Sequence, residues 1–141
     1  MSLLSWNVRG LGQTTRCDDV LCELVAQRPS FVALQETKLS NIDARKRKTF
    51  LPTRLSDFAF KESHGAAGGI VSAWDSSFCT LRSTVIWTYS LTTSFTLKSD
   101  SSPFTATNVY APTAHADKPA FLAELHDLAA SICEPWVVIG F

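Results

Sequence analysis

The sequence has 141 residues, of which 45% are hydrophobic, and it contains four tryptophans and nine phenylalanines, enough for one buried core. The 13 Lys and Arg residues balance the 13 Asp and Glu residues, so the formal net charge at pH 7 is zero. This neutrality excludes a strongly basic nucleic-acid binder of the tail or zipper kind, but it leaves room for a site built from a few well-placed charges.

The first half of the chain alternates predicted strands and helices. In chain order we expect a strand at residues 3–8, a helix from about residue 15, a strand at 31–37, a short helix at 42–51, and strands at 57–63 and 69–75, with a hairpin-like loop at 64–69 between the last two. Thr15 and Asp18 resemble a capping box at the start of the first helix, and Pro29 ends it.

The second half is mostly β-rich, with one clear helix. We expect two antiparallel strands within residues 78–97, joined near Tyr89 and Ser90, a strand at 104–112, a helix at 117–132 and a strand at 136–140. The helix has one apolar stripe, formed by Phe121, Leu122, Leu125, Leu128, Ala129 and Ile132. Without repeats or linkers, the pattern predicts one domain over residues 1–141, of the α+β class with two packed sheets.

The four cysteines, Cys17, Cys22, Cys79 and Cys133, show neither a C-x-x-C pair nor metal-finger spacing. We expect reduced and mostly buried thiols. The opening MSLLSWNVRG is too quickly polar for a secretory signal, and no apolar run approaches membrane-spanning length. We therefore expect an intracellular protein, nuclear or cytoplasmic, with no membrane association.

Polar side chains recur where predicted strands end. Asn7 lies near the C-terminal end of the first predicted strand, Glu36 near that of the second, and Asn108 and Tyr110 near that of a later one. One such residue simply marks where a chain meets solvent, but the set supplies a carboxylate, two amides and a phenol. Magnesium binds through one or two carboxylates and keeps several waters, so this set predicts a hard-cation site acting on a phosphodiester.

Five segments resemble a known family in their order and rough spacing. They are LLSWNVRGLG, FVALQETKL, GAAGGIVSAW, NVYAP and WVVIG, which together run over essentially the whole chain. The sequence resembles the endonuclease/exonuclease/phosphatase superfamily, and it looks most like the N-terminal part of the apurinic-endonuclease-like domain of plant LINE-type (non-LTR) retrotransposons. The pairing of SWNVRGLG with LQETKL is the specific part of this resemblance.

The resemblance implies a four-layer α/β/β/α sandwich of the DNase I-like type and magnesium-dependent cleavage of phosphodiester bonds, with manganese as an alternative metal. In the retrotransposons this activity nicks chromosomal DNA so that reverse transcription can be primed there. DNA is therefore the expected partner, and no obligate protein partner is inferred.

The resemblance also implies roles for individual residues. Glu36 of QET would be the metal-binding carboxylate, and Asn7 of WN would help to order the metal and its waters. Tyr110 of NVYAP would hydrogen-bond the scissile phosphate, with Asn108 beside it as a weaker candidate for the catalytic set.

The sequence departs from the family after WVVIG. The family continues into Gly-Asp-Phe-Asn, whose Asp is the expected general base, whereas Gly140 is followed here by Phe141. The family's later Asp and Asp-His pair have no counterpart, and His64, His115 and His126 do not match the missing histidine. We expect a domain truncated before its second sheet is complete and inactive alone, because loss of a general base costs on the order of 10² to 10⁴ in rate.

Two further features have competing interpretations. A basic run lies on the short predicted helix and consists of Arg45, Lys46, Arg47 and Lys48. It is either a contact surface for a DNA backbone or a solvated helix face. Trp74 and Trp87 either stack on an extruded base or pack in the core, which their β-rich surroundings favour.

Two other functions stay open. The first keeps the superfamily but changes the substrate, giving a phosphomonoesterase or an inositol or lipid phosphatase. The second is non-catalytic: a remnant that binds nucleic acid or another partner through the basic helix and the surviving strands.

Overall fold

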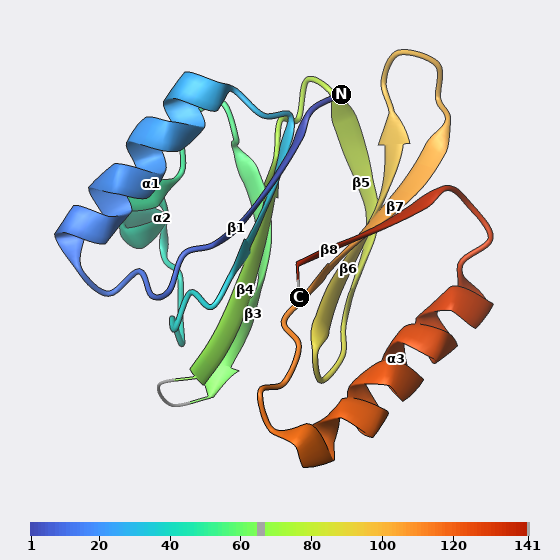
Figure 1. Ribbon diagram of the computed structural model, residues 1–141. Coiled ribbons are helices and arrows are strands. Elements are labelled where there is room, and N and C mark those ends of the chain that lie inside the picture. The colour runs from blue at the N-terminus through green and yellow to red at the C-terminus, as the bar shows by residue number, and fades with distance from the viewer. Residues whose placement is uncertain (65–66, 141) are drawn as a thin grey trace.

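The computed structural model describes residues 1–64 and 67–140. The first half contains β1 (Leu3–Asn7), α1 (Thr14–Gln27), β2 (Phe31–Gln35), α2 (Ala44–Phe50), β3 (Asp57–His64) and β4 (Ala67–Trp74). The second contains β5 (Cys79–Ile86), β6 (Ser90–Leu97), β7 (Pro103–Val109), the 3₁₀ turn η1 (His115–Asp117), α3 (Lys118–Ser131) and β8 (Trp136–Gly140). Figure 1 shows α1 and α2 outside one sheet and α3 outside the other, which gives four layers.

Both four-stranded sheets are mixed. The first has the order β1-β2-β4-β3, and only β1 and β2 are parallel. The second has the order β5-β6-β7-β8, and only β7 and β8 are parallel. Each parallel pair is connected through a helix, α1 or α3, because the chain must return to the same end of the sheet before the next strand begins. The expected α+β fold with two packed sheets is confirmed.

Aromatic rings fill the space between the sheets. The Phe95 ring from β6 lies 5.8 Å from Phe31 and 5.0 Å from Trp74, both in edge-to-face geometry, and it stacks on Phe104 with centroids 5.0 Å apart. Trp74 is therefore a core residue, as its β-rich surroundings favoured. Trp87 differs, because it lies beyond the end of β5 and is 36% exposed.

A buried amide also links the two sheets. Asn108, on β7 of the second sheet, is completely buried. Its Nδ2 donates to the backbone oxygen of Val71 at 2.9 Å, and more distantly to Leu34 O and Ser72 Oγ, both at 3.3 Å. Its Oδ1 accepts from Gln35 Nε2 at 2.9 Å. All four partners belong to β2 and β4, so one side chain fixes how the second sheet sits on the first.

Two helix details differ from the sequence expectations. The residue that precedes α1 is Gln13, and no side chain caps the helix, so the expected capping box of Thr15 and Asp18 is wrong. Both residues lie inside the helix, whereas a cap acts from the position before it. In α3, Phe121 is buried but Leu122 is 62% exposed, because neighbouring helical positions point about 100° apart.

All four cysteines are free thiols. Cys17 and Cys79 are buried, whereas Cys22 and Cys133 are exposed, so only half of them meet the expectation of burial. Burial, with a smaller effect of the Asp75 charge, raises the pKa of the Cys79 thiol to about 11. Within the described ranges no helix combines the length and apolarity that crossing a membrane requires.

The buried amide link predicts a measurable coupling. Asn108→Leu should lower the free energy of unfolding by about 1–3 kcal/mol, because it leaves buried hydrogen-bonding groups without a partner. Asn41→Leu, at an exposed position, is the matched control and should change it little. In urea unfolding, the double variant Gln35→Leu/Asn108→Leu should lose less than the sum of the two single variants. Additive losses would contradict the link.

Candidate functional site

The candidate site begins where β1 and β2 end. These strands are parallel and Asn7 pairs with Gln35, so Asn7 and Glu36 leave the first sheet at the same edge. Asn7 is exposed, and its Oδ1 accepts a hydrogen bond from the backbone N–H of Arg9 at 3.1 Å. The structure thus brings to one edge the two residues for which the sequence predicted a metal-binding role.

The backbone around Glu36 is held by neighbouring loops. Its carbonyl accepts from the Gly10 N–H at 2.7 Å, and the Lys38 N–H donates to the Gly68 carbonyl at 2.9 Å. Glu36 and Lys38 have φ of +56° and +57°, in the left-handed region that non-glycine residues seldom adopt. Such conformations cost on the order of 1–3 kcal/mol each and cluster at functional sites. The surrounding hydrogen bonds therefore impose the direction in which Glu36 leaves the strand.

The Glu36 carboxylate brings a negative charge to this edge. Its side chain is 23% exposed, and its Oε1 lies 3.7 Å from Lys38 Nζ. After the end of β7 in the second sheet, burial raises the pKa of the Tyr110 phenol, and the negative charge of Glu36 raises it further. Glu36 and Tyr110 are therefore within electrostatic reach although they follow strands of different sheets.

Asn108 and Tyr110, the other two predicted site residues, lie in different environments. Tyr110 follows the end of β7, is half-buried, and borders an open pocket. Asn108 is fully buried, and its carboxamide oxygen and nitrogen are both taken by the first sheet. This geometry leaves the Asn108 amide no room to contact a phosphate, and we propose that it positions Tyr110 instead.

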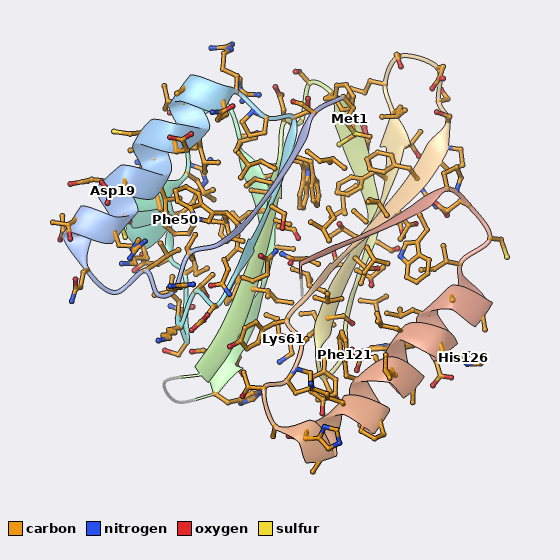
Figure 2. All side chains as sticks on the ribbon, in the orientation of Figure 1. Met1, Asp19, Phe50, Lys61, Phe121 and His126 are labelled. Carbon is orange, nitrogen blue, oxygen red and sulfur yellow. The ribbon has the colours of Figure 1, made fainter. Side chains whose placement is uncertain are left out.

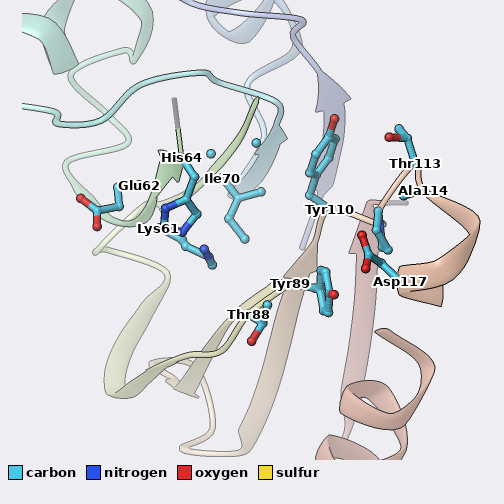
Figure 3. A pocket seen from close by; sticks show the side chains of 13 residues that line it. Lys61, Glu62, His64, Ile70, Thr88, Tyr89, Tyr110, Thr113, Ala114 and Asp117 are labelled. Atoms are coloured by element: carbon cyan, nitrogen blue, oxygen red, sulfur yellow. The ribbon is translucent and has the colours of Figure 1, made fainter. Parts of the chain in front are cut away.

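The pocket beside Tyr110 has a volume of about 280 Å³. Figure 3 shows Lys61 and His64 of β3 on one side, and Tyr89, Tyr110 and Asp117 on the other. The sequence predicted a role in the site for Tyr110 alone among these, and His64 did not match the histidine that the family resemblance implies. The signal was weak, because the lining residues come from four separate segments of the chain.

The two remaining histidines lie outside this pocket. Figure 2 shows His126 on the outer side of α3, pointing away from the sheets, and its side chain is 84% exposed. His115 is exposed in η1.

The basic run on α2 does not form one surface. Arg47 donates to the backbone oxygens of Pro52 and Leu55, so its guanidinium holds the loop after the helix. Lys46 Nζ lies 3.6 Å from Cys17 Sγ of α1. Only Arg45 and Lys48 are exposed. A nucleic-acid surface on α2 would have two free cations rather than four.

Few protein ligands are available for a magnesium ion at this edge. Among the residues that the structure describes, no three His, Cys, Asp or Glu side chains come together as a metal cluster. Glu36 and Asn7 nevertheless offer one carboxylate and one amide oxygen at the same edge. This suits a hydrated magnesium ion, which keeps most of its waters and uses few protein ligands.

No family model matches this sequence, and no curated protein matches it. Among solved structures, it is similar to a conserved protein of unknown function from Enterococcus faecalis V583, with a TM-score of 0.71, 19% identity, and coverage of 98% of this chain and 65% of that one. It is also similar to D. rerio TDP2 complexed with single strand DNA product, with a TM-score of 0.66, 17% identity, and coverage of 98% and 58%.

A third similar structure is the mannosyl-6-phosphatase Bt3783 from Bacteroides thetaiotaomicron VPI-5482, with a TM-score of 0.67, 11% identity, and coverage of 98% and 63%. The chain spans less than two thirds of the length of each of these three structures. The likeness establishes the fold: two mixed four-stranded sheets that match part of the DNase I-like fold.

The close packing of the loop after Glu36 against β4 requires glycine at position 69. Gly69 has φ of +89°, and a Cβ there would lie 2.4 Å from Thr37 Oγ1 and 3.1 Å from the Lys38 nitrogen. Gly69→Ala should therefore destabilise the protein by roughly 1–2 kcal/mol or more in urea unfolding. A Cβ on Gly12 would meet nothing within 4 Å, so Gly12→Ala is the matched control. Equal stability of the two variants would contradict this packing.

The pKa of Tyr110 reports the charge of Glu36. The chain has two tyrosines, so Tyr89→Phe leaves Tyr110 as the phenol followed by ultraviolet absorbance. In that background Glu36→Gln should lower the Tyr110 pKa, because removing a negative charge favours the phenolate, while burial keeps it above its ordinary value. Glu62→Gln, in the same pocket, is the control. An unchanged Tyr110 pKa in the Glu36→Gln variant would contradict the electrostatic interaction between the two side chains.

Proposed function

We propose that residues 1–141 bind a magnesium ion and a phosphodiester at the edge formed by β1, β2 and β7, as part of a DNA endonuclease of the retrotransposon type. The observation that carries this proposal is the placement of Glu36, which follows β2 at the same sheet edge as Asn7 and lies within electrostatic reach of Tyr110. The order of the sequence motifs and the residues within them support the retrotransposon branch.

Each residue has a defined part in this proposal. Glu36 and Asn7 hold the metal, which when bound polarises a phosphoryl oxygen, with manganese able to replace magnesium. A tyrosine phenol keeps its proton at neutral pH, and the raised pKa of Tyr110 favours the protonated form further, so its hydroxyl can donate a hydrogen bond to a phosphate oxygen. Lys38, which pairs with Glu36, balances the carboxylate charge before a metal binds.

Binding is expected without efficient cleavage. Among the described residues no three His, Cys, Asp or Glu side chains come together as a metal cluster, and none of the residues assigned to the site is a general base. Catalytic residues that act as a unit lose most of their effect when part of the set is missing. We therefore propose that this polypeptide is inactive by itself.

DNA is the proposed substrate, and two alternatives remain to be tested against it. The similarity to D. rerio TDP2, described with a single-stranded DNA product, supports a nucleic-acid substrate. The similarity to a mannosyl-6-phosphatase favours, as the second candidate, a phosphomonoesterase, including an inositol or lipid phosphatase. A non-catalytic nucleic-acid-binding remnant would use the basic helix, whose exposed cations are Arg45 and Lys48, together with the strands.

Metal binding can be measured without turnover. In the Tyr89→Phe background, magnesium should lower the Tyr110 pKa, because a divalent cation at Glu36 reverses the local charge that opposes the phenolate. Glu36→Gln should abolish this response, whereas Glu62→Gln should keep it. A magnesium response that persists in Glu36→Gln would contradict the proposed ligand.

Supercoiled plasmid with magnesium, and then with chelator, tests turnover. No metal-dependent nicking is expected, and clear nicking that disappears in Glu36→Ala would overturn the proposed inactivity while supporting the site. Hydrolysis of a phosphomonoester panel without any effect on DNA would replace the proposed substrate by the second candidate. DNA affinity that falls with salt, ignores magnesium and depends on Arg45 and Lys48 would favour the non-catalytic remnant.

A further inference from the structure

The pocket beside Tyr110 contains more chemistry than the proposed phosphate site uses. Lys61 and His64 line one wall and two tyrosine rings the other, with Asp117 at the side of η1 (Figure 3). Its volume of about 280 Å³ lies just below the range of about 300–1,000 Å³ typical of small-molecule pockets. A ligand of this size is a single compact group, and a lipid chain or a folded peptide is too large.

The wall that Tyr89 provides is held rigidly by α3. The Glu124 carboxylate accepts from the backbone N–H of Thr88 and of Tyr89, both at 3.0 Å, and from Ser90 Oγ at 2.8 Å. A single acidic side chain thus fixes the turn between β5 and β6. This interaction explains why a half-buried carboxylate lies on the sheet-facing side of α3.

The ring of Tyr89 is fixed as well. It packs edge-to-face against Phe121 of α3, with centroids 5.7 Å apart and planes at 87°. The Tyr89 carbonyl accepts from the Tyr110 N–H at 3.0 Å, so the two tyrosines that border the pocket are joined through the backbone. A ring that is already ordered loses little conformational entropy when a ligand binds against it.

The lining chemistry favours a planar ring with both donors and acceptors. Aromatic side chains stack on a nucleobase irrespective of its identity. Lys61 and His64 can donate to acceptors on the ring, whereas Asp117 can accept from its donors. An inositol carrying several phosphates would instead bring negative charge against the Asp117 carboxylate.

We propose that this pocket is a nucleobase subsite, in which the base attached to the bound phosphate packs against the ring of Tyr89. The proposal rests on the proposed function for the phosphate alone, which binds at Glu36 and Tyr110. Because Tyr110 borders both places, base and phosphate of one nucleotide unit can occupy them together. The pocket then selects nucleotides over sugar phosphates by the presence of a ring.

The test compares thymidine monophosphate, deoxyribose phosphate and thymidine by NMR titration of the full chain with magnesium. Thymidine monophosphate should bind about tenfold more tightly than deoxyribose phosphate, which lacks the base. Tyr89→Ala should remove that difference and leave the affinity for deoxyribose phosphate unchanged, whereas Tyr89→Phe, which keeps the ring, should retain it. Equal affinities of the two phosphates in the unchanged protein would overturn the subsite.

A second variant guards against misfolding of Tyr89→Ala. Ala114 is an exposed residue at the pocket, so Ala114→Phe should fill the pocket without disturbing the core, and it should remove the preference for the base. A preference that survives Ala114→Phe would contradict the location.

Thymidine itself, without phosphate, separates the two proposals. If the phosphate site fails, magnesium and Glu36→Gln will have no effect on thymidine monophosphate, while Tyr89→Ala still weakens thymidine. If the nucleobase subsite fails, thymidine will not bind, while deoxyribose phosphate still responds to Glu36→Gln.

Discussion

The hydrogen bond between Gln35 and Asn108 determines the geometry on which the site depends. It joins two fully packed sheets across 73 positions of sequence, and Glu36 follows Gln35 directly while Tyr110 lies two residues after Asn108. The same contact that holds the sheets together therefore sets the spacing between the carboxylate of one sheet and the phenol of the other. Both amides are buried, so water cannot take the place of either one if their hydrogen bond breaks. The spacing between Glu36 and Tyr110 is therefore maintained wherever the fold is maintained.

Much of this arrangement could be predicted from local pattern, because strand ends and helix-connected parallel strands leave clear signals. The change from FVAL to Gln35 and Glu36 marked the end of the apolar run, although the predicted strand at 31–37 extends two residues beyond the observed end of β2 at Gln35. The role of Asn108 could not be predicted, since local sequence does not show which face of a strand will meet another sheet. Arg47 is similar: its charge indicated solvent, whereas the carbonyls that it binds become available only after the following loop folds.

Backbone strain was equally hidden from the sequence. Arg9, Glu36 and Lys38 all have positive φ, although none is a glycine or an asparagine, the residues that usually adopt it. Gly68 and Gly69 belong to β4, which passes beside Lys38, and their lack of side chains allows its close approach. Strain on the residue that bears the carboxylate, with flexibility placed on its neighbour, is the arrangement expected where the direction of one side chain matters more than local stability.

Tyr110 connects the carboxylate edge with the pocket, because it contacts both environments. Its phenol responds to the charge of Glu36, and its N–H is bound by the carbonyl of Tyr89, whose turn is held by Glu124. A ligand that carries both a phosphate and a ring would engage both environments, and each contact would raise the effective concentration of the other group at its own place. A ligand with only one of these groups gains no such advantage. The fold therefore couples α3, which lies far from Glu36 in the sequence, to the carboxylate edge through two tyrosines and one turn.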